Sequence, residues 1–292
     1  MSVPLAYIGV ILIWSTTPLG IKWSGEDVGF IFGVTARMLL GAFVCLVFLA
    51  LLSRRMKWNR KALHTYLAAG IGVWSTMSLV YWAAQHVSSG LISVIFGLMP
   101  LITGVMAAIW LNERVFTLPR IAGMTLGLVG LMAVFYEHLD ADSHAVIAMV
   151  AILSAVTCQS ISAVWVKRIG SKMHPLEVTT GALLIALPLF GLLYIASGHS
   201  LPVAISERTA WSIAYLGVFG SALGFILYFY VLKWVEAGKV ALIALVTPVM
   251  ALMLGQWINH EVVAPSEWFG TLLILFGLAS YQWGERWTHR AA

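Results

Sequence analysis

The sequence predicts an all-α integral membrane protein in which ten transmembrane helices form two inverted repeats of five helices each. The first observation is composition: 61% of the residues are hydrophobic and 10% are charged, whereas about 25% of the residues of a soluble domain are charged. The second is a series of ten apolar stretches of about 20 residues, the length that crosses a bilayer. The third is an internal repeat, in which three residues recur 148 positions later: Gly90, Pro100 and Glu113 return as Gly238, Pro248 and Glu261.

Each expected span is a long apolar run, and no polar linker divides the chain. In order, the spans are expected at 3–23, 29–52, 64–86, 90–111, 118–137, 144–167, 175–197, 209–233, 239–259 and 265–285. The predicted domains are a first five-helix repeat over 1–138, a second over 144–287, and a cytoplasmic tail over 288–292. Cys45 and Cys158 both fall inside spans, so we expect no disulfide and no cysteine-based metal site. We also expect no other metal site and no cofactor.

The distribution of charge predicts how the chain is oriented in the membrane. Basic residues gather in alternate loops and at the end of the chain: Arg54, Arg55, Lys57, Arg60, Lys61, Arg114, Arg120, Lys167, Arg168, Lys172, Lys233, Lys239, Arg286 and Arg290. The opposite loops are mainly acidic: Glu26, Asp27, Glu137, Asp140, Asp142, Glu207, Glu261 and Glu267. Because cytoplasmic loops carry an excess of Lys and Arg, we expect a multi-pass protein of the cytoplasmic (inner) membrane with both termini in the cytoplasm. The net charge of +5 therefore reflects topology and indicates no nucleic-acid partner.

The repeat is predicted to be inverted, because five spans per half is an odd number and the second copy must enter the membrane the other way up. Glu113 then falls at the cytoplasmic end of its span and Glu261 at the outer end of its own. Val87 also corresponds to Val235 at the same offset, and a weaker match at an offset of 145 pairs Lys22 with Lys167.

Paired prolines and glycines mark two kinds of special helix. Pro100 and Pro248 lie near the middle of equivalent spans, and paired interruptions of this kind point to the binding site of a transporter; the alternative is a packing kink that neighbouring helices tolerate. Small residues in the fifth and tenth spans, which permit close helix approach, are Gly123, Gly127, Gly130, Gly270 and Gly277. We interpret them as packing within one chain, and so favour a monomer over a homodimer.

These features together resemble the drug/metabolite transporter superfamily, in particular its ten-helix exporters with two tandem EamA domains. The resemblance rests on Trp14, Pro18 and Lys22 in the first span, on Arg37 in the second, and on the segment from Gly90 to Arg114 with its echo from Gly238 to Glu261. It covers nearly the whole chain and is strongest for the bacterial exporters of aromatic amino acids. It implies export of amino acids or similar small metabolites, while other branches carry nucleotide sugars, triose phosphates or cationic drugs.

One departure from that superfamily concerns proton coupling. Its short four-helix members use a glutamate in the first helix, but the first span here holds no carboxylate. Across all spans the one candidate is Glu177, near the cytoplasmic end of the seventh. Facilitated export down a gradient therefore fits at least as well as proton antiport.

Candidate substrate-binding residues are aromatic and polar side chains at helical spacing inside the spans. The clearest stripe is Trp74, Ser78, Tyr81 and Gln85 in the third span, because a lipid-facing stripe should be aliphatic; interfacial anchoring is the alternative for Tyr81 and Gln85. Further candidates are Trp14, Thr17, Phe96, Met99, Gln159 and Trp165. Aromatics at the two ends of the cavity are expected to act as gates: Tyr81, Trp82 and Phe96 outside, and Tyr228, Phe229 and Tyr230 inside.

Two basic residues lie within spans. Arg37 can meet the carboxylate of an amino acid. It can equally hold backbone carbonyls, or pair with Glu26 or Asp27 and fix the outer loop; we favour the structural role. Lys22 is expected to reach the outer interface as a structural charge.

The predicted function is secondary transport by alternating access of two inverted halves around a midplane cavity. No GxxxxGK[ST] motif is present, so the chain is not expected to pump with ATP. An exporter of cationic drugs or of another metabolite class is the main alternative. A membrane-embedded enzyme is disfavoured, because the eight histidines are scattered and no HExxH motif occurs.

Overall fold

The computed structural model describes residues 2–111, 117–139, 143–170, 172–198, 200–236, 240 and 243–291. Regular structure in these ranges is helical throughout, with no strand. Two anchors of the sequence repeat, Glu113 and Gly238, lie outside the described residues. The helices are α1 (Val3–Ser24), α2 (Phe30–Leu51), α3 (Arg60–Ala83), α4 (Ser89–Phe96), α5 (Met99–Leu111), α6 (Leu118–Leu139), α7 (Ser143–Ile169), α8 (Pro175–Ala196), α9 (Glu207–Tyr215), η1 (Leu216–Leu223), α10 (Gly224–Trp234), α12 (Ile243–Asn259) and α13 (Pro265–Ala291).

Six stretches of the described chain are long and apolar enough to cross a membrane. They are Val3–Ser24, Phe30–Leu51, Ser89–Leu111, His144–Ile169, Pro175–Ala196 and Glu207–Trp234. The remaining predicted spans correspond to α3, α6, α12 and α13, which fall outside that set. The last of these helices continues to Ala291, through most of the segment expected to be a tail.

The fourth predicted span is divided into two helices by a turn at Gly97 and Leu98. Pro100 lies in the first turn of α5, where its missing N–H group leaves no helical hydrogen bond unmade. The break expected at Pro248 is not found: Pro248 lies inside α12, which continues without interruption to Asn259. Neighbouring helices can re-satisfy the backbone groups that a proline frees, so one proline of the pair marks a break and the other does not.

The eighth predicted span contains a π-helical segment, η1, between α9 and α10. It packs against α2, and a Cβ atom added at Gly41 of α2 would lie 2.7 Å from Cβ of Ser221. The wider turn of a π-helix is rare and often marks a functional site. Here it brings Gly220 and Ser221 up to the side chain of Arg37.

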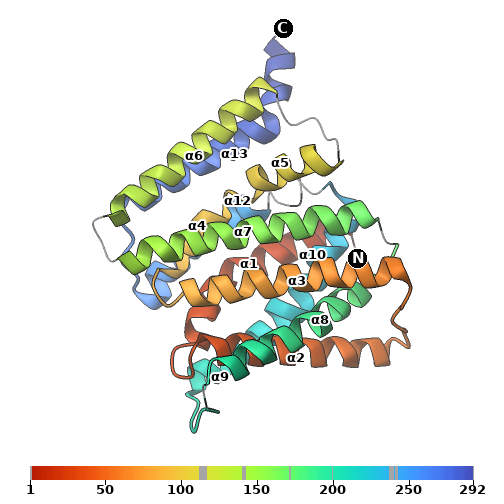
Figure 1. The fold of residues 1–292 in the computed structure, drawn as a ribbon. Helices are drawn as coiled ribbons and strands as arrows, with labels where there is room; N and C mark the ends of the chain where they lie inside the picture. The colour runs from red at the N-terminus through yellow and green to blue at the C-terminus, as the bar shows by residue number, and fades with distance from the viewer. Residues whose placement is uncertain are drawn as a thin grey trace.

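Helices α6 and α13, which end the two predicted repeats, form a pair that lies apart from the other helices (Figure 1). Glycines let their backbones touch: a Cβ atom at Gly130 would lie 2.7 Å from the carbonyl oxygen of Gly270. The equivalent contact joins Gly123 and Gly277. The packing role expected for these glycines is therefore played between the two halves of one chain.

The most extensive helix contacts all join the first half of the chain to the second. They are α6 with α13, α3 with α7 and α8, α2 with α8, and α12 with α4 and α1. In Figure 1, α3 lies beside both α7 and α8 in the middle of the molecule. The two halves are thus interlocked and share one hydrophobic core.

Candidate functional site

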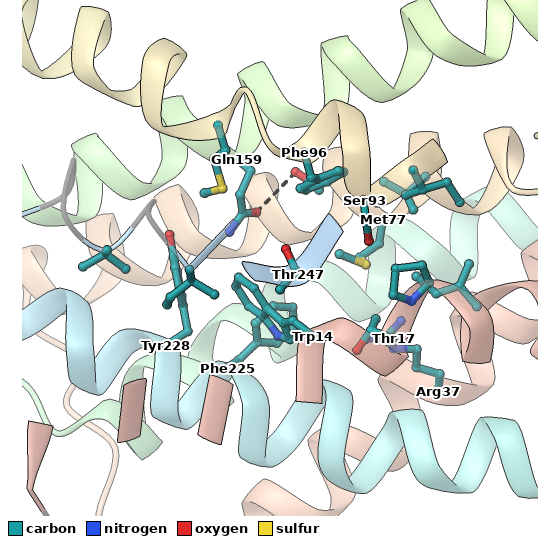
Figure 2. A pocket seen from close by; sticks show the side chains of 18 residues that line it. Trp14, Thr17, Arg37, Met77, Ser93, Phe96, Gln159, Phe225, Tyr228 and Thr247 are labelled. Atoms are coloured by element: carbon teal, nitrogen blue, oxygen red, sulfur yellow. Dashed lines mark hydrogen bonds between the residues drawn. The ribbon is translucent and has the colours of Figure 1, made fainter. Parts of the chain in front are cut away.

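A cavity of about 80 Å³, room for several water molecules, lies at the centre of this core. Helices from both halves surround it, and Figure 2 shows its lining side chains. The lining residues are Trp14, Thr17, Pro18, Ile21, Arg37, Thr76, Met77, Val80, Ile92, Ser93, Phe96, Met99, Gln159, Phe225, Tyr228, Val240, Ile243 and Thr247. Most are apolar or aromatic and a few are polar, which is typical of a small-molecule site.

Aromatic rings from α1 and α10 form one wall of the cavity. The indole of Trp14 lies 5.1 Å from the ring of Tyr228 and 6.4 Å from that of Phe225, measured between ring centroids. Phe96, the last residue of α4, lines the cavity where the broken span turns. Such rings offer flat apolar surface on which an aromatic or aliphatic group can stack.

The polar groups of the lining are sparse. The hydroxyl of Thr76 contacts the side-chain oxygen of Gln159 at 3.3 Å, drawn as a dashed line in Figure 2, and the carbonyl oxygen of Ala155 at 3.2 Å. The buried hydroxyl of Tyr228 interacts only weakly, with the side chain of Gln159, among the described residues. A ligand or water that bonded to it would remove the cost of an unsatisfied buried hydroxyl.

Arg37 is the charged member of the described lining, and it is 1% exposed. Its Nε donates to the hydroxyl of Ser221 at 2.8 Å, and Nη1 donates to the hydroxyl of Tyr81 at 3.5 Å. The pairing expected with Glu26 or Asp27 is wrong. Those carboxylates bind groups at the start of α9 instead: Glu26 pairs with Arg208 at 3.7 Å, and Asp27 accepts from Thr209 at 2.9 Å.

Trp14, Thr17, Phe96, Met99 and Gln159 all line the cavity, as does the expected gate Tyr228. The stripe predicted on α3 does not. Trp74 and Ser78 are half-buried outside the cavity, and Gln85 is exposed beyond the end of α3. Tyr81 is fully buried but does not line the cavity. Its hydroxyl contacts Arg37 and accepts a hydrogen bond from the hydroxyl of Ser24 at 3.1 Å.

The error on α3 has a geometric cause. Thr76, Met77 and Val80 face the cavity, so the lining stripe is rotated around the helix from the polar stripe that periodicity selected. Because α3 packs against both α7 and α8, the faces that it turns to them contact protein rather than lipid. Polar residues can lie on those faces too, so polarity does not identify the face that lines the cavity.

Three further candidates lie away from the cavity. Trp165 of α7 is 47% exposed and packs beside Trp110, with 5.8 Å between ring centroids. Trp82, expected to be a gate, packs against His86 at 5.0 Å, and Tyr230 is half-buried outside the lining. Of the three α10 aromatics expected to act as inner gates, Tyr228 alone lines the cavity, while Phe229 is buried in the core. Consecutive residues of a helix point to different faces, so the three cannot all reach one cavity.

Several of the lining residues that sequence reasoning missed follow the internal repeat. Four pairs of lining positions are separated by 148 residues: Met77 and Phe225, Val80 and Tyr228, Ile92 and Val240, Met99 and Thr247. Trp14 and Gln159 correspond at the second offset, 145. Met99 is a candidate from the sequence, and Thr247 is its partner in the repeat. Including the repeat partner of each candidate would therefore have predicted Thr247 as a lining residue.

One end of the molecule is closed by a cluster around Glu261. Its carboxylate accepts from Lys22 Nζ at 3.3 Å and from the side-chain nitrogen of Asn259 at 2.9 Å. It also accepts from the backbone N–H and hydroxyl of Ser89 at 2.9 and 2.8 Å. The N-terminus of α4, with its exposed N–H groups and positive dipole end, favours such an anion.

The opposite end carries basic residues. Arg54 pairs with the buried carboxylate of Glu177 at 3.7 Å. Lys167 Nζ donates to the carbonyl oxygens of Val235 and Leu232 at 2.7 and 2.9 Å. Glu177 is therefore held by an ion pair and does not line the cavity.

Apolar helices of membrane-crossing length around a small-molecule cavity define a multi-pass membrane transporter. The chain belongs to the EamA-like transporter family, whose model matches residues 1–136 and, a second time, residues 146–281. Family membership thus identifies a transporter rather than an enzyme.

Curated relatives carry transporter names. The chain is 25% identical over 284 residues to the uncharacterized transporter YoaV of Bacillus subtilis, covering 95% of this chain and 96% of the relative. It is 24% identical to a probable amino-acid metabolite efflux pump of Escherichia coli, with 95% and 94% covered. It is also 28% identical to a probable terminal-alkyne amino-acid exporter of Streptantibioticus cattleyicolor, with 73% and 70% covered. A solved crystal structure 18% identical in sequence has the same fold, with a TM-score of 0.71 and 98% of each chain covered.

Proposed function

We propose that this chain is a secondary transporter that exports amino acids, aromatic and other neutral ones, or similar small metabolites across the cytoplasmic membrane by alternating access. The observation that carries the proposal is the central cavity, because repeat-related positions of both halves line it. Transporters built from inverted repeats hold their substrate at that interface, near the bilayer midplane.

Two lysine contacts support the inverted arrangement of ten spans. Lys22 donates to the carbonyl oxygen of Val87 at 3.5 Å, and Lys167 donates to that of Val235 at 2.7 Å. The two lysines and the two valines are repeat partners in the sequence. The same contact thus occurs once in each half, and the two lie at opposite ends of the molecule, as an inverted repeat requires.

The end that holds Arg54, Lys167 and Lys233 is proposed to face the cytoplasm. Its basic character agrees with the excess of Lys and Arg in cytoplasmic loops, and both termini would then be cytoplasmic. The end around Glu261 and Glu26 would face outward.

The substrate class is supported by the lining and by the names of relatives. Rings of Trp14, Phe96, Phe225 and Tyr228 suit an aromatic or large aliphatic body. Two relatives are named as exporters or efflux pumps of amino acids or their metabolites.

Within the described lining there is no carboxylate to carry a proton. Glu177, the one acidic candidate in the predicted spans, is held by Arg54 outside the cavity. This favours facilitated export over proton antiport. It also disfavours the alternative of a cationic-drug exporter, since a buried cationic substrate would meet Arg37 and no opposing charge.

The test is uptake of radiolabelled L-phenylalanine and L-leucine into proteoliposomes that contain the purified protein. Wild type should show uptake above protein-free vesicles, and Trp14→Ala should reduce the phenylalanine rate about tenfold, the equivalent of about 1.4 kcal/mol. The matched control is Trp58→Ala, since Trp58 is 73% exposed and distant from the lining. Equal rates for wild type and Trp14→Ala would show that this cavity is not the transport site.

A further inference from the structure

We propose that Arg37 is the receptor for a substrate carboxylate, so that the cavity selects monocarboxylates with an apolar body whether or not they carry an amino group. This inference rests on the proposed transport function and names the substrate class of the same site. Two readings of Arg37 compete, a ligand-binding cation and a purely structural one, and four observations favour the first.

The first observation is an uncompensated buried charge. Arg37 is 1% exposed, and no carboxylate of the described residues lies within ion-pair distance of it. Its two hydrogen-bond partners, Ser221 and Tyr81, are neutral hydroxyls. A buried cation without an opposing charge is costly, and a substrate carboxylate would supply that charge.

The second observation is unused donor capacity. A guanidinium has five N–H donors, and two hydrogen bonds to described residues use two of them. The remaining donors include the second terminal nitrogen, Nη2. Arginine forms bidentate pairs with carboxylates through such neighbouring N–H groups.

The third observation is that the backbone makes room for the guanidinium. Ser221 and Gly220 both belong to η1, whose π-helical turn departs from the regular helix on either side. A Cβ atom at Gly220 would lie 3.0 Å from Nη2 of Arg37, so a side chain at this position would crowd the nitrogen. The ring of Tyr81 lies below the guanidinium, 5.8 Å from its central carbon.

The fourth observation is the polarity of the cavity along its length. In Figure 2, Arg37 and Thr17 lie at one end of the lining, Tyr228 and Gln159 lie at the other, and Trp14 lies between them. A molecule with its carboxylate at Arg37 would place its apolar body against Trp14 and Phe225. The ammonium group of an α-amino acid is bonded to the same carbon atom as its carboxylate, so it would lie at the Arg37 end as well, where the hydroxyl oxygen of Thr17 is a neutral acceptor. The described lining holds no carboxylate that would require an amino group.

The ligand test uses four compounds that differ only in their charged groups. L-phenylalanine and 3-phenylpropionate have the carboxylate; L-phenylalaninamide and phenethylamine lack it. Each competes with labelled phenylalanine in wild-type proteoliposomes. We expect the two carboxylates to inhibit at concentrations within about fivefold of each other and the other two to need at least tenfold more. Equal inhibition by all four compounds would overturn the inference.

The variant test separates binding from structure. Arg37→Met should raise the phenylalanine KM at least tenfold, and Arg37→Lys, which keeps the charge, should recover part of that loss. Gly220→Ala should also raise KM, because its Cβ crowds Nη2. The matched control is Arg208→Met, which removes a half-exposed ion pair outside the cavity and should leave KM unchanged.

Thermal unfolding of purified wild type and Arg37→Met, with and without each compound, covers the case of a variant that folds poorly. Stabilisation by 3-phenylpropionate should occur in wild type and disappear in Arg37→Met, whereas a structural arginine would change the unfolding temperature without changing the ligand response. Failure of the proposed amino-acid function would appear differently, as no phenylalanine transport by wild type. In that case, stabilisation of the wild type by 3-phenylpropionate but not by phenethylamine still supports the carboxylate site at Arg37. If 3-phenylpropionate does not stabilise the wild type, the inference about Arg37 is overturned.

Discussion

Glu261 shows how a single residue can join three segments that are far apart in sequence. Burial raises the pKa of its carboxyl group, but donation from Asn259, the charge of Lys22 and two donors of Ser89 outweigh burial, so the pKa lies below its usual range. The side chain is 6% exposed. Its ionised form therefore stabilises the contact among α1, α4 and the segment after α12.

Glu261→Gln should lower the stability of the protein by about 1 to 3 kcal/mol at neutral pH, because charged hydrogen bonds are lost. A carboxyl whose pKa is depressed by folding stabilises the protein fully above its unfolded pKa, about 4.3. That contribution disappears as pH falls through the lower folded value. The difference in unfolding temperature between wild type and variant should thus be constant from pH 8 to 6 and shrink below about pH 4. A difference that grows on acidification would contradict the assigned pairing.

Among single residues, four of the aromatic or polar candidates inside spans line the cavity, whereas Trp74 and Trp165, chosen on the same ground, do not. The four are Trp14, Thr17, Phe96 and Gln159. The prediction for α3 was wrong because the polarity of the side chains was used to decide which face of the helix lines the cavity. Trp74 and Thr76 lie two positions apart and so face different directions, and nothing in a single helix says which direction leads to the cavity.

At the scale of elements, the pair of α6 and α13 depends on glycine. A Cβ atom at Gly130 would lie 2.7 Å from the carbonyl oxygen of Gly270 and 3.0 Å from Ile274. Backbone atoms cannot move aside as a flexible side chain can, so the helices would have to separate.

Gly130→Ala should destabilise the protein by about 1 to 3 kcal/mol, the range for overpacked contacts. Gly191 of α8 is the matched control, because its added Cβ would meet nothing within 4 Å. Alanine in a helix is favoured over glycine by roughly 0.5 to 1 kcal/mol, so Gly191→Ala should be neutral or stabilising. Thermal unfolding in detergent compares the two, and equal effects would show that α6 and α13 are not in close contact.

The interrupted helices could be predicted only in part. A proline removes a backbone hydrogen bond wherever it stands, yet α12 continues past Pro248 while α4 ends before Pro100. The π-helical turn of η1 had no sequence signal at all. Whether a helix continues or is interrupted at such a point depends on whether neighbouring helices offer hydrogen-bond partners to the backbone groups that are left unpaired.

At the scale of the whole molecule, the two halves are interlocked, so we expect that they do not rock as separate bodies. Every major helix contact joins one half to the other, including those of α6 with α13 and of α3 with α7 and α8. Any bundle that moves during transport must therefore mix helices from both halves. The end that we propose faces outward, where Lys22 pairs with Glu261, is one place where such bundles would part.

A thiol cross-linker that joins Lys22→Cys to Glu261→Cys should reduce phenylalanine transport at least tenfold, since the proposed alternating access requires this end to open in each cycle. The variant is made in a background that lacks the two native cysteines, Cys45 and Cys158. Rates are measured before cross-linking, after it, and after reduction, so that loss of the ion pair is separated from the cross-link itself.

The matched control joins Pro119→Cys of α6 to Ser280→Cys of α13. These positions adjoin, since the hydroxyl of Ser280 donates to the carbonyl oxygen of Pro119 at 3.2 Å. Because the pair is expected to move as one unit, this cross-link should leave transport unchanged. Full activity with the positions of Lys22 and Glu261 cross-linked would mean that this end of the molecule does not open there.

The sequence by itself determined the helical class, the approximate positions of the helices, the internal repeat and the aromatic character of the site. Each of these features follows from the composition and residue spacing of a single helix, or from comparing the two repeats of the sequence. Only the tertiary structure decided which face of α3 meets the cavity, that Arg37 binds Ser221 and Tyr81 rather than an acid, and that the halves interlock. The physical reason is that lipid and protein interior are both apolar. Periodicity therefore tells which residues share a face, and only helix packing determines where that face points.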